Sequence, residues 1–481
     1  MTELTPSSAA PEGRKAGLER VSLRGDLSGW IFLALCAVVA LAPLPLGSAR
    51  PLAWDIMALF VGLLLILSLF LPSNGNGLTK ELALPFILFG IVIVFILLQT
   101  SPWVPAALQN PLWEQASESL NRAIDGSIAV ERNAAFQDLL RLICYSGIFY
   151  LAWLTGRDGA RARIAIWLVA VSGNVYATYG LVDYWSGNKT VLWFPKLAYL
   201  TDLTGTFVNR NSFATYLGIC TLAALCLLLQ LFSRVELRGD WRRKLAATIE
   251  FSSTHIGKLI MFFILVTALV LTHSRGGLLA TLLGTATLMC MIALAPSMGH
   301  LRRIGIWGVV PFVVFLIALL ASGAVTFDRM MSADLDAIQR ITVYRLVIQA
   351  IGNYPLFGIG LGSFAELFPI YRTSAIPVYF DLAHNDYLQN ILELGIPAAI
   401  FFFAALGRLV VICLRGVRIR QRDAIYPCLA VAATVLVGLH ALVDFSLQIP
   451  AVTVAYMFLL GIGVAQSHSS RASGSKKSAT L

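Results

Sequence analysis

The sequence predicts an all-α membrane protein that crosses the bilayer many times, and composition carries most of this prediction. Of its 481 residues, 58% are hydrophobic and 13% are charged, whereas about a quarter of the residues in soluble domains are charged. The apolar residues come in runs that approach the roughly 20 residues a spanning helix needs. A transmembrane β-barrel would instead show a two-residue alternation of apolar and polar residues.

Twelve apolar runs are predicted to be membrane spans, and their even number places both chain ends on one side. The spans are 29–47, 52–72, 83–100, 138–155, 164–184, 211–232, 258–273, 276–295, 305–323, 388–413, 425–443 and 450–466. The predicted organisation is a disordered cytoplasmic tail (1–28), spans one to nine (29–323), a large helical periplasmic loop (324–387), spans ten to twelve (388–466) and a second cytoplasmic tail (467–481). The basic region before the first span is longer than that of a signal peptide, so we expect this span to be retained.

The distribution of basic residues predicts the orientation of the chain. With both ends in the cytoplasm, about 24 of the 36 Lys and Arg residues fall on that side, as the positive-inside rule requires. The 324–387 loop then lies outside. Topology and anionic lipid headgroups account for the basic clusters and the net charge of +10. We therefore predict contacts with membrane lipids and no binding of nucleic acid.

Several other possible sites give weak signals. The seven cysteines lie mostly within apolar runs, without a CxxC pair, as packing residues do. Gly358, Gly360 and Gly362 lack a preceding strand, which favours a tight turn over a nucleotide-binding loop. There is no HExxH motif, and Asp381 and Asp386 are poorly spaced for metal ligation. We predict no essential metal and no cofactor.

A polar block from Arg340 to Pro397 stands apart from the apolar helices, and His384 lies near its centre. His384 precedes a predicted helix from Asp386 to Cys413, whose amino end favours a neutral imidazole and nearby anions. A neutral imidazole is what a general base requires. A surface or helix-capping role is the alternative for this histidine.

Two arginines near predicted span ends are candidate phosphate ligands. Arg210 lies between Asn209 and Asn211 at the start of the sixth span, where guanidinium and helix-start amides can bind phosphate oxygens. An arginine that snorkels to the interface is the alternative. Arg275 follows an apolar run of 13 residues, 259–271. A span this short is expected to leave the turn below the membrane surface, where a charge must face protein or a wet cavity.

Together these residues suit a lipid diphosphate handled on the outer face. Arginines would hold the diphosphate and stabilise the negative charge that grows as it departs, while a histidine takes the proton from an attacking hydroxyl. The predicted catalytic residues are His384, Arg210 and Arg275. The predicted substrate-binding residues are Asn209, Asn211, Arg340, Arg345, Arg372, Asn385, Asp386 and Tyr387.

Around His384 the chain resembles the O-antigen ligase and polymerase superfamily of bacterial envelope glycosyltransferases. The ligase motif of this family is His, then Asn, Ser or Gln, nine further residues, then Gly-x-x followed by Gly, Thr or Tyr. His384-Asn385 and Gly395-Ile396-Pro397 fit this spacing, and Ala398 departs from it at the last position. Further similar segments are Thr206–Asn211, Ser274–Gly277, Gly358–Gly360 and Val443–Leu447.

The resemblance implies a GT-C-like, metal-independent, inverting enzyme that transfers a glycan from undecaprenyl diphosphate to an acceptor hydroxyl at the periplasmic face of the bacterial inner membrane. Arg210 and Arg275 match positions taken to bind the donor diphosphate, and His384 matches the proposed base. Arg340 and Arg345 lie where further loop arginines serve donor or acceptor.

The acceptor remains open at this point. A ligase would use the lipid A core and a polymerase the next repeat unit, and the departure at Ala398 weakens the ligase assignment relative to the polymerase. A protein O-oligosaccharyltransferase is a third option. The rival from another class is a polysaccharide flippase or other twelve-span transporter, which would show internal repeats and charged residues near the midplane of several helices.

Overall fold

The computed structural model describes residues 26–71, 80–232, 241–299, 301–302, 335–374, 376 and 379–468. This part of the chain is helical apart from one short antiparallel hairpin, β1 (Thr190–Val191) and β2 (Phe194–Pro195). The all-α prediction is confirmed within these ranges. The predicted ninth span at 305–323, the beginning of the large loop at 324–334 and most of both tails lie outside the described residues.

Every other predicted span coincides with a helix. These helices are α1 (Leu27–Leu41), α2 (Pro51–Ser68), α3 (Lys80–Thr100), α5 (Arg132–Thr155), α6 (Gly159–Trp185), α7 (Arg210–Phe232), α8 (Trp241–Leu271), α9 (Arg275–Leu294), α13 (Asp386–Ile419), α14 (Ile425–His440) and α15 (Pro450–Ala465). Within the described ranges, α2, α3, α5, α6, α7, α9 and α13 are long and apolar enough to cross a membrane, and the other four contribute shorter apolar helices. The chain is therefore a multi-pass membrane protein by these criteria, while the count of twelve spans stays a prediction.

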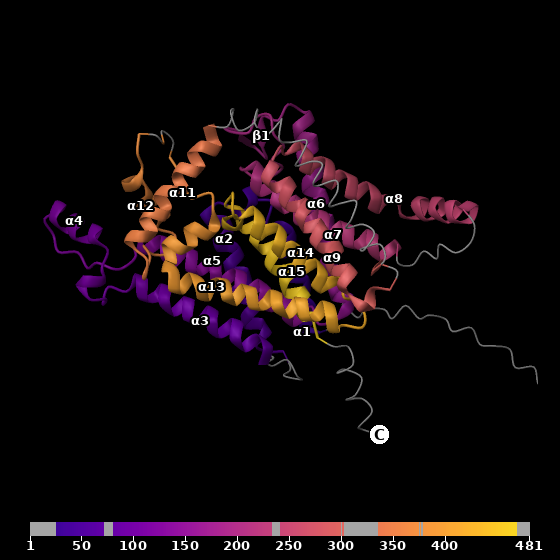
Figure 1. The fold of residues 1–481 in the computed structure, drawn as a ribbon, viewed down its shortest axis with the longest axis horizontal. Coiled ribbons are helices and arrows are strands. Elements are labelled where there is room, and N and C mark those ends of the chain that lie inside the picture. Colours follow the sequence, from indigo (N-terminus) through magenta and orange to yellow (C-terminus); the bar gives the residue numbers. More distant parts are fainter. Residues whose placement is uncertain are drawn as a thin grey trace, which may run out of the picture.

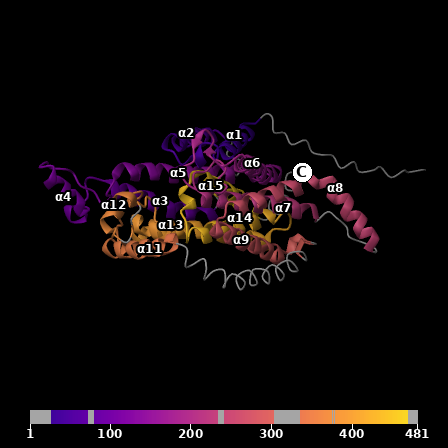
Figure 2. The ribbon, with the colours of Figure 1, turned by 90° about the horizontal axis from the view of Figure 1, so that it is seen from above.

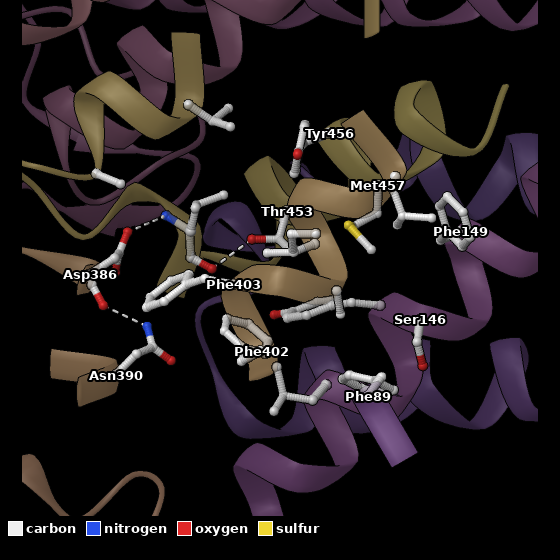
Figure 3. Close-up of a pocket in the computed structure, with 18 of the residues that line it drawn as sticks. Phe89, Ser146, Phe149, Asp386, Asn390, Phe402, Phe403, Thr453, Tyr456 and Met457 are labelled. Atoms are coloured by element: carbon white, nitrogen blue, oxygen red, sulfur yellow. Dashed lines mark hydrogen bonds between the residues drawn. The ribbon is translucent and has the colours of Figure 1, made fainter. Parts of the chain in front are cut away.

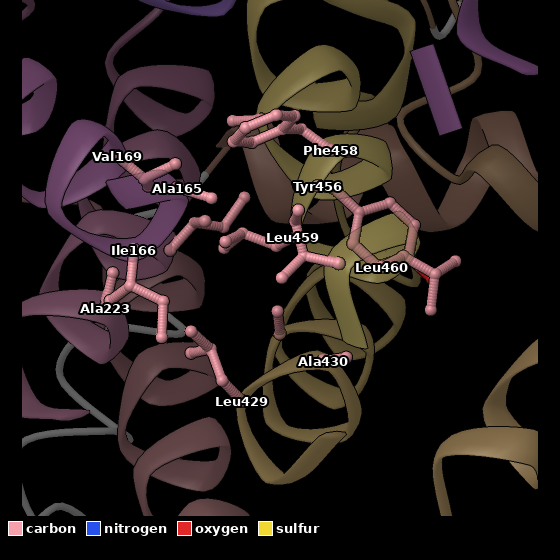
Figure 4. Packing of buried hydrophobic residues seen from close by; sticks show 14 of the residues in the cluster. Ala165, Ile166, Val169, Ala223, Leu429, Ala430, Tyr456, Phe458, Leu459 and Leu460 are labelled. Atoms are coloured by element: carbon pink, nitrogen blue, oxygen red, sulfur yellow. The ribbon is translucent and has the colours of Figure 1, made fainter. Parts of the chain in front are cut away.

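Helix α7 forms the centre of the bundle. In the 18-residue apolar stretch of α7, 94% of the residues are buried, whereas in that of α3 only 22% are. It packs against α6, α8, α9, α14 and α15, and side chains of α6, α7, α14 and α15 interlock around Val169, Ala223 and Leu459 (Figure 4). A Cβ on Gly173 would lie 2.3 Å from that of Cys220, so a glycine allows α6 and α7 to approach closely.

The described part of the predicted large loop forms a small helical unit at one end of the bundle. It contains α11 (Leu335–Asn353) and α12 (Phe364–Tyr371), which share a buried apolar cluster that includes Val343, Phe364 and Phe380. Figures 1 and 2 place both helices at the end where the short helix α4 (Pro111–Ser119) projects. The predicted large loop is thus helical where the structure describes it.

Helix α13 is broken at Gly395, and the break explains both the glycine at this position and the glycine run at 358, 360 and 362. Gly395 adopts φ 75° and ψ 159°, a conformation that side chains with a Cβ rarely adopt. Backbone amides of Ile359 and Gly360 donate to carbonyls of α13 just before the break. A Cβ on Gly358 would lie 2.4 Å from the carbonyl oxygen of Glu393. The glycine run is thus a tight turn packed on the break, as the sequence favoured.

One boundary differs from the prediction in a way that bears on the site. The apolar part of α8 extends from His255 to Leu271, longer than the expected run of 13 residues, and it includes Lys258, whose amine lies over the Trp167 ring at 5.4 Å. The length argument for a submerged turn at Arg275 is correspondingly weaker. Short 3-10 turns occur at Leu46–Ser48 (η1), Ala106–Leu108 (η2), Pro296–Met298 (η3) and Ser446–Gln448 (η4).

Candidate active site

The start of α13 is fastened to the loop that joins α14 and α15. Asn385 caps α13 by accepting a hydrogen bond from the Leu388 amide at 3.0 Å, and its side-chain amide donates to the Leu442 carbonyl at 2.9 Å. The Asp386 amide donates to the Ala441 carbonyl at 2.9 Å, and its carboxylate accepts from the Leu447 amide at 3.3 Å. Asn385 and Asp386, predicted to bind substrate, therefore hold the chain segments that position His384.

His384 is clamped in a strained backbone conformation. Its φ is +54°, in the left-handed region that residues other than glycine seldom occupy. The hydroxyl of Tyr344 donates to the His384 carbonyl at 2.7 Å, and burial raises the pKa of this hydroxyl to about 12, so it stays a donor. The imidazole packs edge-on against Phe445, with ring centres 4.7 Å apart. Such strain persists where surrounding contacts over-determine it, often at functional sites.

Asp444 is the partner of the His384 imidazole. Its Oδ1 lies 3.4 Å from His384 Nδ1, within ion-pair distance and long for a hydrogen bond. Burial alone would raise the pKa of Asp444, but the adjacent His384 imidazole and the charges of His440 and Arg340 hold it below its ordinary value. An ionised Asp444 favours the imidazole tautomer with its proton on Nδ1, which leaves Nε2 free to accept a proton.

Three of the predicted arginines line one cavity. This cavity has a volume of about 590 Å³, and Arg210, Arg275 and Arg340 reach it from α7, α9 and α11. Its remaining walls are formed by Asn211, Leu269, Val270, His273, Ser274, Gly276, Leu278, Ile341, Tyr344 and Val443. None of the described residues that line it is acidic, so it suits an anionic group. We call it the cationic cavity.

The cationic cavity is linked to His384 through its wall. Tyr344 lines the cavity and bonds the His384 carbonyl, while Arg340 donates to the Val443 carbonyl at 3.0 Å, one residue before Asp444. His384 itself is not among the residues that line the cavity. The predicted arginines and the predicted base therefore belong to one connected set of contacts, in which Tyr344 and the Val443–Asp444 segment join the cavity to His384.

Glycine at position 276 lets the turn that carries Arg275 pack on the Asp444 loop. A Cβ on Gly276 would lie 3.0 Å from Nε2 of His440, and the other ring nitrogen of His440 lies 2.5 Å from the Thr215 hydroxyl and 3.3 Å from that of Ser446. The Ser446 hydroxyl in turn donates to Asp444 at 3.0 Å. Close packing against His440 therefore explains the glycine at position 276 of the Ser-Arg-Gly-Gly segment.

The remaining predicted substrate ligands lie elsewhere. Asn209 caps α7 by accepting from the Asn211 amide at 2.7 Å. Arg345 on α11 and Arg372 at the end of α12 are exposed, and neither is among the residues that line the two cavities described here. The Tyr387 hydroxyl donates to the Gly438 carbonyl at 2.9 Å.

A second cavity of about 350 Å³ opens between α3, α5, α13, α14 and α15, and we call it the apolar cavity. Figure 3 shows Asp386 and Asn390 at one end, with Phe89, Phe149 and Met457 towards the other. Asp138, Glu393 and Arg141 also line it, and Asp138 pairs with Arg141. Its acidic residues are thus Asp138, Asp386 and Glu393, and its basic residue is Arg141.

Sequence reasoning missed three residues: Asp444, His273 in the wall of the cationic cavity, and Asp202, whose carboxylate pairs with Arg210 and His273. Asp444 was visible only inside a family-like segment, and no spacing ties it to His384, 60 residues earlier. Among the residues that the structure describes, no group of three or more His, Cys, Asp or Glu side chains is arranged to hold a metal ion. Metal independence stays a prediction.

Comparison with known proteins bears on this geometry. Residues 260–403 match the Wzy_C family model, described as O-antigen ligase. The resemblance to the O-antigen ligase and polymerase superfamily is confirmed. The matched segment holds Arg275, Arg340 and His384. A search of curated proteins found no match.

The family match has consequences at a general level. It supports a ligase-type or polymerase-type function, in a family of glycosyltransferase-like enzymes whose substrates are glycans and lipid-linked molecules. Together with the apolar helices it supports a multi-pass membrane protein. It does not distinguish an O-antigen ligase from a polymerase.

Proposed function

We propose that this protein transfers a glycan from undecaprenyl diphosphate to an acceptor hydroxyl at the periplasmic face of the bacterial inner membrane, as an O-antigen ligase that uses the lipid A core. The observation that carries the proposal is the cationic cavity, where Arg210, Arg275 and Arg340 converge from three separate segments beside His384. Guanidinium groups bind phosphate oxygens through paired hydrogen bonds.

The proposed reaction is a single displacement at the anomeric carbon of the donor. Nε2 of His384 takes the proton of the acceptor hydroxyl, and the hydroxyl oxygen forms the new bond to the anomeric carbon. The bond from that carbon to the diphosphate oxygen breaks, and its electron pair stays on the diphosphate. The arginines stabilise the added negative charge. Attack opposite the leaving group inverts the anomeric configuration.

Asp444 has a positioning role in this scheme. Its carboxylate fixes the imidazole tautomer and stabilises the imidazolium that forms when His384 accepts the proton. The diphosphate is already a good leaving group, so holding the two substrates in line supplies much of the acceleration. We propose that the reaction needs neither a metal nor a cofactor.

A repeat-unit polymerase of the same superfamily is the second candidate, favoured by Ala398 at the last position of the ligase motif. Gel analysis of lipid-linked and surface glycans in a deletion strain separates the two. A ligase defect leaves long glycan on undecaprenyl diphosphate, whereas a polymerase defect leaves single repeat units. Unaltered glycans in both pools would contradict the proposal.

The flippase alternative is tested with Arg275→Ala expressed in the deletion strain. An enzyme defect leaves the lipid-linked donor on the outer side, unused and accessible to added glycan-modifying reagents. A transport defect leaves the donor on the inner side. Accumulation on the inner side would overturn the assignment of Arg275 to a transferase site.

A further inference from the structure

His273 lines the cationic cavity, next in sequence to the Ser-Arg-Gly-Gly segment, and the proposed reaction leaves it without a role. Its side chain is 49% exposed and its Nδ1 lies 2.8 Å from Oδ1 of Asp202. The other oxygen of Asp202 lies 2.8 Å from the Arg210 guanidinium. One carboxylate therefore holds both a histidine and a predicted catalytic arginine.

Asp202 is placed to fix both side chains. Its own side chain is 9% exposed, and its backbone carbonyl accepts hydrogen bonds from Lys196 at 2.8 Å and Asn188 at 3.0 Å. The neighbouring Leu203 amide donates to the carbonyl of Leu271 at 3.0 Å. The loop before α7 is thus fastened to the end of α8, and both carboxylate oxygens of Asp202 are used. Nδ1 of His273 is occupied, which leaves Nε2 for a ligand.

The backbone at His273 is strained. Its φ is +51°, and it lies two residues after Leu271, the last residue of α8, at the position past a helix end where glycine is the usual residue. The Thr272 hydroxyl, which donates to the Leu269 carbonyl at 2.7 Å and accepts from the Ser274 amide at 3.2 Å, holds the turn. A strained histidine where glycine would be relaxed points to a function for the side chain.

The charges around the cationic cavity indicate what the His273 side chain can do. Arg210, Arg275 and Arg340 contribute three positive charges and Asp202 one negative charge, which leaves a net of +2. A diphosphate that links a lipid to a glycan carries about two negative charges and gains a third when the glycan leaves. An imidazolium at position 273 would match that third charge.

We propose that His273 is a further catalytic residue, which donates a hydrogen bond from Nε2 to the departing lipid diphosphate, and that Asp202 positions it together with Arg210. In the step, the anomeric carbon–oxygen bond breaks and the electron pair stays on the phosphate oxygen that His273 contacts. The acceptor proton goes to His384, on the other part of the site. This inference rests on the proposed function and adds a residue that stabilises the leaving diphosphate.

The test uses the full-length protein in nanodiscs, with farnesyl diphosphate and farnesyl phosphate as probes in calorimetric binding. We expect His273→Gln to weaken farnesyl diphosphate binding about tenfold, the effect of one charge-assisted hydrogen bond, and to leave farnesyl phosphate binding nearly unchanged. His273→Lys restores most of the lost affinity because it keeps a cation. His255→Gln is the matched control, since His255 lies 18 residues earlier and does not line the cavity.

His273→Gly separates a chemical role from a structural one. Glycine relaxes the left-handed backbone, so this variant is expected to unfold at or above the wild-type temperature while losing diphosphate affinity as His273→Gln does. In glycan transfer, His273→Gln should lower kcat far more than it raises KM, because the third charge appears only as the bond breaks.

The outcomes of these experiments are distinguishable. Equal loss of affinity for both probes, unchanged affinity for farnesyl diphosphate, or no rescue by lysine would overturn the role of His273. If wild-type protein transfers glycan while His273→Gln does so equally well, the inference fails and the proposed function stands. If wild-type protein neither prefers the diphosphate nor transfers glycan, the proposed function itself fails.

Discussion

The two cavities differ in charge, and the proposed reaction centre lies between the segments that line them. The cationic cavity is lined by three arginines and a histidine, with no acidic residue among its described lining. The apolar cavity is lined mostly by aromatic and aliphatic side chains, with Asp138, Asp386 and Glu393 as its carboxylates. Val443 lines the first, Leu447 lines the second, and Asp444 follows Val443 directly. A diphosphate fits only the first by charge.

The difference fits the proposed separation of binding from chemistry. In the proposed reaction the arginines hold the donor, whereas His384 and Asp444 act at the bond being made. The predictions below test this separation.

The largest expected effect is the loss of transfer in His384→Ala. Removing a general base typically costs two to four orders of magnitude in rate. In the proposed reaction no other histidine of the described residues takes the proton of the acceptor hydroxyl. Glycan transfer by purified protein measures the loss, with protein amount in the membrane as the control for folding. Transfer near the wild-type rate would remove His384 from the mechanism.

Asp444→Asn is expected to lower transfer by about two orders of magnitude, because an amide neither fixes the tautomer of His384 nor stabilises its imidazolium. The affinity for farnesyl diphosphate should change little. A mutant that loses diphosphate binding but keeps kcat would show that Asp444 supports the cationic cavity instead of the base.

Arg275→Ala should weaken farnesyl diphosphate binding by about tenfold or more, as loss of a charged hydrogen-bond donor does. Phe402→Ala, in the apolar cavity, should leave that affinity unchanged. Arg418→Ala is a second control, exposed near the far end of α13. If Phe402→Ala weakens diphosphate binding as strongly as Arg275→Ala, the assignment of the two cavities is wrong.

The smallest effect is expected from chelation. Transfer by purified protein should persist in EDTA, because the proposed site uses guanidinium groups where other glycosyltransferases use a divalent cation. Activity that disappears in EDTA and returns with a specific cation would contradict the metal-free scheme.

The sequence predicted the helices well because membrane spans have a simple signal. Long apolar runs leave little choice of structure, since backbone groups in lipid must be paired within a helix. The site was predictable in part. Arg210 and Arg275 stood out as charges near span ends and Arg340 as a charge in the large loop, and the structure brings them to one cavity.

The missed residues share a different property. Asp202 and Asp444 lie in short loops far from their partners in sequence, and nothing local marks a carboxylate that will meet a histidine 71 or 60 residues away. Asn385 and Asp386 were expected to bind substrate, but their polar groups fasten α13 to the next loop. Long-range polar pairing is set by tertiary packing, which a single sequence does not display.

The central claim is that the arginines bind the donor diphosphate while His384 acts only in the chemical step. The most direct measurement compares farnesyl diphosphate binding and glycan transfer for His384→Ala and Arg275→Ala side by side. We predict that His384→Ala binds the diphosphate as the wild type does and fails to transfer, and that Arg275→Ala loses binding. Wild-type binding by Arg275→Ala, or lost binding by a folded His384→Ala, would contradict the account.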